Sequence, residues 1–301
     1  GLLTFVSWLP THYKHLFSAY VAETNRQLQG VIQVSPFNRS ESTWRIDRLI
    51  ADPGSGAQDT STALIRYCLQ NIWKARTWVL EVKVSNTDAL AIYRQNGFQP
   101  LAQITHWDFS PELLKTLSQR EPDLPNLMPV SNCDAQLLYQ LDTVSMPPII
   151  RQVFDRHILD FKTSLFDSIM ESFKQWMSKT ESVSGYVFEP QRKAAIGHFQ
   201  MQLSRQGAFP HHAELTVHPA YTWLYPELLA QMARVTLELP TQSLRLTSTD
   251  YQAEREEFSQ QLGARPIEQT LLMSRSVWHK LRETKQVTLD GLQLSDVFGG
   301  L

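Results

Sequence analysis

One stretch of the chain, residues 80–98, constrains the fold more than any other part of the sequence. Its first residues alternate between apolar and polar side chains, which predicts a β-strand with one buried face. Ser85 or Asn86 can cap a following helix, because a short polar side chain accepts a hydrogen bond from a first-turn amide. Asn96-Gly97 supplies the left-handed residue that commonly ends a helix. The stretch is therefore predicted to be a strand, a helix and a tight turn in succession.

The residues around this stretch predict further strands. Residues 17–34 alternate β-branched and aromatic residues on either side of a polar turn, which predicts a hairpin. A third strand is expected at 44–51, and it ends at Asp52-Pro53. The small-residue loop Gly54–Ser61 then leads into a helix whose apolar residues recur every four positions. Segment 102–109 predicts the strand that closes the first sheet.

The order of elements repeats in the second part of the chain. Residues 185–203 predict a hairpin, 212–217 a strand, 244–248 a strand that leads into a helix, and 269–275 a final strand. Between the copies, helical periodicity is interrupted by Met146-Pro147-Pro148. A further helix is expected within 161–177, and the chain is predicted to contain two copies of one fold.

The second copy departs from the first where chemistry is expected. Trp223 and Tyr225 follow the strand exit, where the first copy has a loop of small residues that lets a ligand approach the backbone. Ser259 stands where the first copy has Tyr93. We therefore expect a second copy without catalytic activity.

Length and composition limit the classes of function. The chain has 301 residues, enough for two domains of about 150 residues each. No apolar run approaches the roughly 20 residues that span a bilayer. The formal net charge is −2 and like charges are not clustered, so neither nucleic acid nor a membrane is an expected partner.

The two cysteines, Cys68 and Cys133, are too few for a disulfide framework or a metal cluster, which predicts a reducing, cytoplasmic location. The apolar start at residues 2–6 lacks basic residues and soon meets Pro10, so a signal peptide is not expected.

The spacing of Asn86, Ala89, Tyr93 and Gly97-Phe98 after a strand resembles half of the acetyl-CoA-binding site in the GCN5-related N-acetyltransferase (GNAT) family. The strand, proline, loop and helix at 44–73 resemble the other half of that site. The resemblance implies an α/β (α+β) fold: two tandem GNAT-like acyl-CoA N-acyltransferase domains, each with a mixed, mostly antiparallel twisted sheet flanked by helices.

The expected domains are an N-terminal GNAT-like domain, 1–110, a connector, 111–128, and a degenerate C-terminal domain, 129–301. The first lacks much of the usual first strand and early helices. The protein is expected to be a monomer with paired domains or a homodimer.

By the same resemblance, acetyl-CoA is the expected cofactor. The residues expected to bind it are Leu49, Ile50, Ala51, Gly54, Ser55, Gly56, Ala57, Gln58, Asp59, Thr60, Ser61, Asn86 and Tyr93. Unpaired amides at a helix start form an anion site suited to its pyrophosphate. The loop lacks the family's Arg and most of its glycines, and Asp59 would oppose a phosphate. Either the loop still binds the cofactor, or the site is degenerate and has lost this binding.

Tyr93 and Asp47 are the candidate catalytic residues. In the family, a Tyr at the position of Tyr93 commonly donates a proton to the departing thiolate; the alternative is a core aromatic. Asp47 is the candidate base, although strand alternation places it on the same face as Arg45 and Leu49, which also predicts a solvated or salt-bridged carboxylate. No metal is expected, and the histidines of the second copy are interpreted as structural.

The sequence therefore predicts an acetyl-CoA-dependent N-acetyltransferase that acts on an unidentified primary amine, either a small molecule or a peptide. The alternative is a non-catalytic acyl-CoA-binding or scaffold protein built on two decayed GNAT folds.

Overall fold

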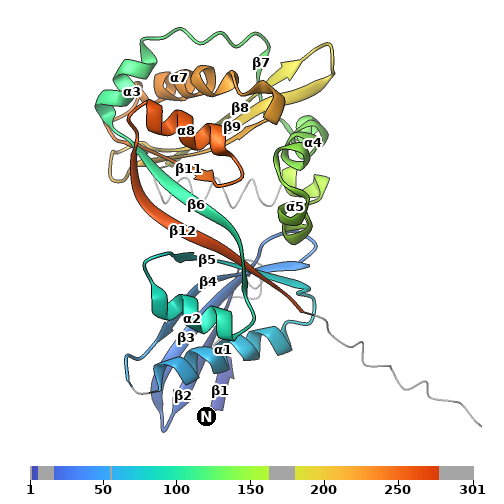
Figure 1. Cartoon of the computed structure of the whole chain (residues 1–301), viewed down its shortest axis with the longest axis vertical. Helices are drawn as coiled ribbons and strands as arrows, with labels where there is room; N and C mark the ends of the chain where they lie inside the picture. Colours follow the sequence, from blue (N-terminus) through green and yellow to red (C-terminus); the bar gives the residue numbers. More distant parts are fainter. Residues whose placement is uncertain (1, 6–16, 55, 163–179, 278–301) are drawn as a thin grey trace, which may run out of the picture.

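The computed structural model describes residues 2–5, 17–54, 56–162 and 180–277, with backbone alone for 2–5. Its strands form one twelve-stranded sheet in the order β1-β2-β3-β4-β5-β12-β6-β11-β10-β9-β8-β7. Figure 1 shows a lower half and an upper half joined by two long strands, β6 and β12, that cross between them.

The described residues of the first half form three helices and six strands. They are β1 (Leu2–Phe5), β2 (Ser18–Thr24), β3 (Gln27–Pro36), β4 (Thr43–Ala51), α1 (Ala57–Asn71), β5 (Thr77–Lys83), α2 (Thr87–Gln95), β6 (Gln99–Phe109) and α3 (Pro111–Ser118).

The second half repeats this order after two additional helices. Its elements are β7 (Leu127–Pro129), η2 (Asn132–Asp134), α4 (Ala135–Ser145), α5 (Pro148–Phe154), η3 (Ile158–Phe161), β8 (Thr180–Glu189), β9 (Ala194–Ser204), β10 (His211–Val217), η4 (Pro219–Tyr221), α7 (Leu224–Thr236), β11 (Leu244–Thr249), α8 (Ala253–Gln261) and β12 (Arg265–Ser276).

The two halves exchange their last strands. β12 pairs with β5 of the first half, with Met273 opposite Leu80. β6 pairs with β11 of the second half, with Trp107 opposite Leu246. β6 and β12 also pair with each other, so each half completes its sheet with a strand from the other.

The hydrophobic cores follow the same exchange. Met273 is fully buried in the core of the first half, under α1 and α2. Trp107 and Phe109 are buried in the core of the second half, where the Trp107 indole donates to Ser248 Oγ at 2.8 Å. Burying an aromatic side chain contributes several kcal/mol, so the exchange is part of both cores.

The strand-helix-turn at 77–98 forms as the sequence predicts. Asn86 caps α2 and accepts a hydrogen bond from the amide of Ala89 at 3.1 Å. Gly97 adopts φ +80° after the helix, and Gly263 adopts φ +83° at the same place in the second copy. These matching caps and turns fix the correspondence between the two halves.

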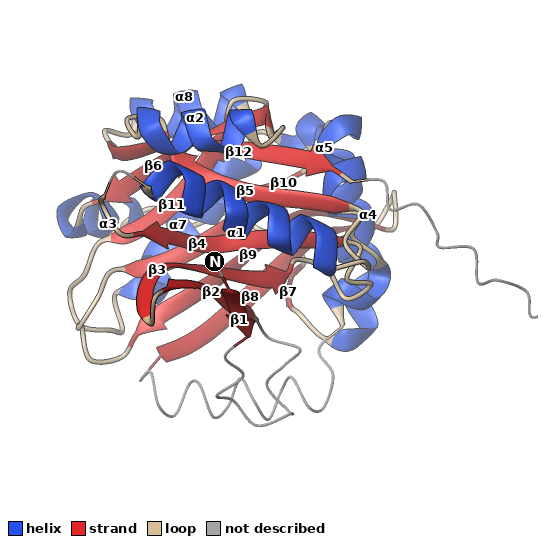
Figure 2. Ribbon diagram, turned by 90° about the horizontal axis from the view of Figure 1, so that it is seen from below, coloured by secondary structure: helices blue, strands red, loops and turns tan. Residues whose placement is uncertain are grey.

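Helices α4 and α5 lie beside the sheet and connect the two halves (Figure 2). The C-terminal end of α5 and the residue after it bind the chain where the β3–β4 loop enters β4: Ser42 Oγ donates to Asp155 Oδ2 at 2.6 Å, and Thr43 Oγ1 donates to the carbonyl of Val153 at 2.8 Å. The Phe37 and Phe154 rings pack with centroids 4.8 Å apart.

The predicted fold class is confirmed, with one difference: the two sheets are fused by strand exchange rather than separate. Segment 102–109 was expected to close the first sheet, but it extends the second. The backbone of β1, which the sequence analysis did not predict, pairs with β2. The helix expected within 161–177 falls almost entirely outside the described residues. The limits 1–110, 111–128 and 129–301 stay a prediction.

We predict that Met273→Ala destabilises the first half, although Met273 belongs to the last strand. Removing this fully buried side chain is expected to lower the free energy of unfolding by about 2–5 kcal/mol. Urea unfolding followed by circular dichroism would measure it. Gln269→Ala, an exposed change on the same strand, is the control and should stay within about 0.5 kcal/mol. Equal effects would contradict the exchange as a source of core packing.

Candidate functional site

Strands β4 and β5 run side by side and then diverge. Their parallel pairing ends with Ile46 opposite Leu80, although β4 continues to Ala51 and β5 to Lys83. A β-bulge in β4 begins at the same point, where Asp47 is the extra residue between those that pair with β3. Bulges bend a strand and end its pairing. We call the diverging segments, 47–51 and 81–83, the first splay; their facing backbone groups are not paired with each other.

The predicted phosphate loop lies at the open end of the first splay. Its turn is closed by a hydrogen bond from Ala57 N to Gly54 O at 3.1 Å. The amides of Gly56, Gln58 and Asp59 have no acceptor among the described residues. A side chain added at Gly54 or Gly56 would meet nothing within 4 Å, so the backbone there faces open space. Ser55 falls outside the described residues.

The geometry of this loop suits an anion, while its side chains add no positive charge. Amides at the start of the long helix α1 that have no acceptor among the described residues lie at the positive end of the helix dipole. Asp59 lies in the first turn and is exposed. The residues that fit a pyrophosphate are therefore the main-chain donors rather than a cation.

Helix α2 stands beside α1 at this loop. Gln58 Nε2 donates to Gln95 Oε1 at 2.6 Å, which ties the first turn of α1 to the last turn of α2. Asn86 is exposed apart from its cap bond. The loop follows β4 and Asn86 follows β5, so both predicted parts of the site come directly after the two strands of the splay.

Tyr93 lies on the buried side of α2. It is 9% exposed and its ring packs edge-on against Phe98 at 5.8 Å. Burial raises the pKa of Tyr93 to about 12, so its hydroxyl stays protonated at neutral pH and can donate a proton. Both interpretations of Tyr93, a core aromatic and a proton donor, are compatible with this position.

Asp47 is ion-paired, as the strand alternation predicts. Arg45 Nε lies 2.6 Å from Asp47 Oδ1, and the Asp47 side chain is 15% exposed. Its second oxygen, Oδ2, is buried without a partner among the described residues. The carboxylate borders the splay, but Arg45 already neutralises it.

A polar cluster that the sequence analysis missed lies on the same side of the sheet as Asp47. His106 Nε2 lies 2.8 Å from Glu81 Oε1, and the Thr270 hydroxyl donates to the same oxygen. His106 Nε2 and Thr270 Oγ1 are 3.1 Å apart. The hydrogen bond with His106 is the largest cause that lowers the pKa of Glu81, against the opposing effect of burial. These residues come from three strands, so no window of sequence contains them.

The second half has an equivalent splay, and one side chain fills it. Pairing of β10 with β11 ends with Ala213 opposite Leu246. Beyond that point the guanidinium of Arg255 donates to the carbonyls of both strands, Thr247 at 3.2 Å and Leu215. Arg255 is 6% exposed and its pKa is lowered by burial. Arg255 therefore cross-links β10 and β11, whose equivalents in the first half, β4 and β5, have no such bridge among the described residues.

The bulky residues of the second copy behave differently from each other. Tyr225 is buried and stacks on Phe258, with its ring 5.8 Å from the Arg255 guanidinium carbon. Trp223 is half exposed.

The second copy also contains a buried histidine. Burial lowers the pKa of His198 to about 4, which keeps that ring neutral. Within the described part of the chain, no group of three or more potential ligands is placed to hold a metal ion.

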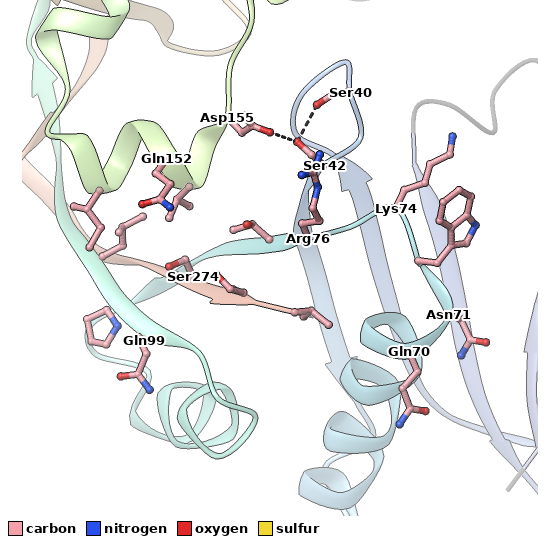
Figure 3. Close-up of a pocket in the computed structure, with 18 residues that line it drawn as sticks. Ser40, Ser42, Gln70, Asn71, Lys74, Arg76, Gln99, Gln152, Asp155 and Ser274 are labelled. Atoms are coloured by element: carbon pink, nitrogen blue, oxygen red, sulfur yellow. Dashed lines mark hydrogen bonds between the residues drawn. The ribbon is translucent and has the colours of Figure 1, made fainter. Parts of the chain in front are cut away.

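A hollow of about 1560 Å³ lies at the far end of α1 from the loop (Figure 3). Lys74 and Arg76 from the segment after α1, Gln152 from α5 and Ser274 from β12 line it. α1 spans about 22 Å, at 1.5 Å per residue. None of the predicted site residues lines this hollow.

Comparison with known proteins identifies the fold. No protein-family model matches the sequence, and none of the curated proteins matches it. Solved structures match across most of the chain. A tandem GNAT protein from the clavulanic acid biosynthesis pathway is 12% identical, with a TM-score of 0.58 over 88% of this chain and 84% of that one. The chain therefore has the fold of tandem GNAT proteins.

Two other solved structures give similar values. A GCN5-related N-acetyltransferase from Sphaerobacter thermophilus is 13% identical, with a TM-score of 0.56 over 89% of this chain and 82% of that one. A protein of unknown function from Staphylococcus epidermidis is 11% identical, with a TM-score of 0.51 over 86% and 95%. None of the described helices is long and apolar enough to cross a membrane.

We predict that His106→Ala raises the pKa of Glu81 toward its ordinary value, because its largest stabilising hydrogen bond is lost. A lowered pKa in the folded state gives stability that is present above the unfolded pKa of about 4.3 and is lost as the pH falls through the folded pKa. Titration of the Glu81 carboxyl carbon by NMR, with Glu81→Gln to assign it, checks the shift. An unchanged pKa would contradict the His106 contact.

Proposed function

We propose that the protein is an acetyl-CoA-dependent N-acetyltransferase that transfers an acetyl group to a primary amine, with the cofactor held by the first half. The observation that carries the proposal is the difference between the two splays. In the first, the strands are not paired with each other and lead to a loop with amides that have no acceptor among the described residues, whereas Arg255 cross-links the second. The tandem GNAT fold supports acyl-CoA as the ligand class.

The first half offers a contact for each part of the cofactor. The amides of Gly56, Gln58 and Asp59 would hold the pyrophosphate at the N-terminus of α1. Residues 49–51 pair with β3 on one side, and their backbone on the side of β5 would hold the pantetheine arm by strand-like hydrogen bonds. Asn86 would contact the cofactor from the start of α2. When bound, acetyl-CoA supplies the activated acetyl group.

The proposed catalytic roles use two residues on opposite sides of the sheet. Tyr93 would donate its proton to the departing thiolate, since a hydroxyl with a pKa of about 12 is protonated at neutral pH. Asp47, on the other side, is the base that the sequence predicts, although Arg45 binds one of its oxygens and the other is buried. The protein would work in the cytoplasm, as its cysteine usage predicts.

The alternative is a protein that binds acyl-CoA or a partner without turnover. The absence of a cation from the loop and the exposed Asp59 favour this alternative, since both weaken phosphate binding.

Calorimetric titration of acetyl-CoA into the whole chain tests the proposal. We expect one molecule bound per chain, because Arg255 cross-links the second splay. No binding at millimolar ligand would rule out the enzyme.

Ala89 occupies in α2 the position that Arg255 occupies in α8, three residues after each N-cap. Ala89→Arg should therefore cross-link the first splay and weaken acetyl-CoA binding at least about tenfold, or about 1.4 kcal/mol. Ala91→Arg, the same change at an exposed position of α2, is the control and should leave the affinity near that of the wild type. Equal loss in both variants would argue for a general effect on the helix.

Tyr93→Phe separates the two interpretations of Tyr93. If the hydroxyl donates a proton, turnover should fall about 10²-fold or more while acetyl-CoA affinity changes little. Release of the CoA thiol would measure turnover, and calorimetry would measure affinity. Unchanged turnover would leave Tyr93 as a core aromatic only.

A further inference from the structure

We propose that Glu81, held by His106 and Thr270, binds the acceptor amine as its ammonium ion and takes its proton. The inference rests on the proposed N-acetyltransferase function and adds the residue that acts on the amine. Glu81 would be the catalytic residue, while His106 and Thr270 position its carboxylate.

The place of Glu81 in the sheet supports this role. Leu80, its neighbour, is the last residue of β5 that pairs with β4, so Glu81 is the first residue of the splay on this strand. Leu80 and Val82 are buried under α1 and α2, and alternation therefore turns Glu81 to the opposite face. Its side chain is 40% exposed there and is accessible to a ligand.

The hydrogen bonds of Glu81 leave one oxygen for a ligand. Oε1 interacts with both His106 and Thr270. Oε2 has no hydrogen bond among the described residues. A carboxylate anchored through one oxygen and open at the other is preorganised to accept a hydrogen bond from an ammonium group.

The charges around Glu81 favour a cationic ligand. On β4, Arg45 is paired with Asp47 at 2.6 Å. On β5 and β12, Lys83 is paired with Glu268. Glu81 is the carboxylate of this group that no Lys or Arg pairs with, and its neighbour on β6 is the imidazole of His106. One positive charge would balance it.

The second half lacks this cluster at the equivalent positions. With Asn86 matched to Gln252 and Gly97 to Gly263, the residues that correspond to Glu81, His106 and Thr270 are Thr247, Leu272 and Ile104. None of these carries an ionisable group. The cluster therefore occurs beside the first splay and is absent beside the splay that Arg255 cross-links.

The proton balance of the step is complete. The ammonium ion gives one proton to Glu81, and the freed lone pair forms the N–C bond as the C–S bond of the thioester breaks. The nitrogen loses a second proton as the amide forms. One proton ends on the CoA thiol and the other passes to solvent, for which His106, at 2.8 Å from Glu81, is placed as a carrier.

Two amines of different charge test the proposal with the whole chain. At neutral pH n-butylamine is an ammonium ion, whereas aniline is neutral and needs no deprotonation before attack. With saturating acetyl-CoA, Glu81→Gln should lower the kcat/KM for n-butylamine at least about tenfold and that for aniline much less. The n-butylamine deficit should shrink as the pH rises toward the amine's own pKa, because the solution then supplies the neutral form.

Matched variants separate this role from others. Glu268→Gln removes a nearby carboxylate on β12 and should leave both rates unchanged. Asp47→Asn removes the carboxylate that Arg45 neutralises and should cost less with n-butylamine than Glu81→Gln. His106→Asn should lower the n-butylamine rate and alter its pH profile, as expected of a positioning residue. Equal losses with both amines in Glu81→Gln, or a larger amine-specific loss in Asp47→Asn, would overturn the proposal.

A binding measurement covers the case in which neither amine turns over. Adding n-butylammonium chloride to the protein without acetyl-CoA should shift the NMR signal of the Glu81 carboxyl carbon, while sodium chloride at the same concentration should not. No shift, with no turnover, would overturn the amine site. Failure of acetyl-CoA to bind in the calorimetric titration would instead remove the proposed function on which this inference rests.

Discussion

The exchange of β6 and β12 is the constraint on which the rest of the structure depends. Because each half ends in the sheet of the other, neither core is closed by local sequence: Met273 completes the first and Trp107 the second. The exchange also builds the polar cluster beside the first splay, since His106 lies on β6 and Thr270 on β12. Stability and the candidate chemistry thus share one topological origin.

The two splays differ in one side chain that bridges the diverging strands: it is present in the second splay, and an alanine takes its place in the first. Both arise where a parallel strand pair stops pairing, after Ile46 in the first half and Ala213 in the second. The first half has Ala89 beside the gap, and the second has Arg255, whose guanidinium replaces missing strand contacts with two bonds to carbonyls. A buried cation without a carboxylate is costly, and those carbonyls with the Tyr225 ring offset part of that cost.

Local features were predictable from the sequence, and long-range ones were not. Alternation and cap chemistry depend on residues within a few positions, so the strand before Asn86, its cap and the shared face of Asp47 and Arg45 were predicted and are present. The strand exchange depends on which edges meet in the folded chain. Glu81 and Thr270 are 189 positions apart, and only the sheet brings them together. Arg255 falls in a mostly polar helix, where its burial leaves no periodic signal.

The exchanged strand β12 also has a consequence for synthesis on the ribosome. The phosphate loop, α2 and Glu81 are translated before the second half, but Thr270 and Met273 lie in β12, the last element that the structure describes. Until β12 has emerged, the edge of β5 has no partner strand from the second half. The helices of the first half can therefore form early, whereas its sheet and its polar cluster are completed only after the rest of the second half has been translated.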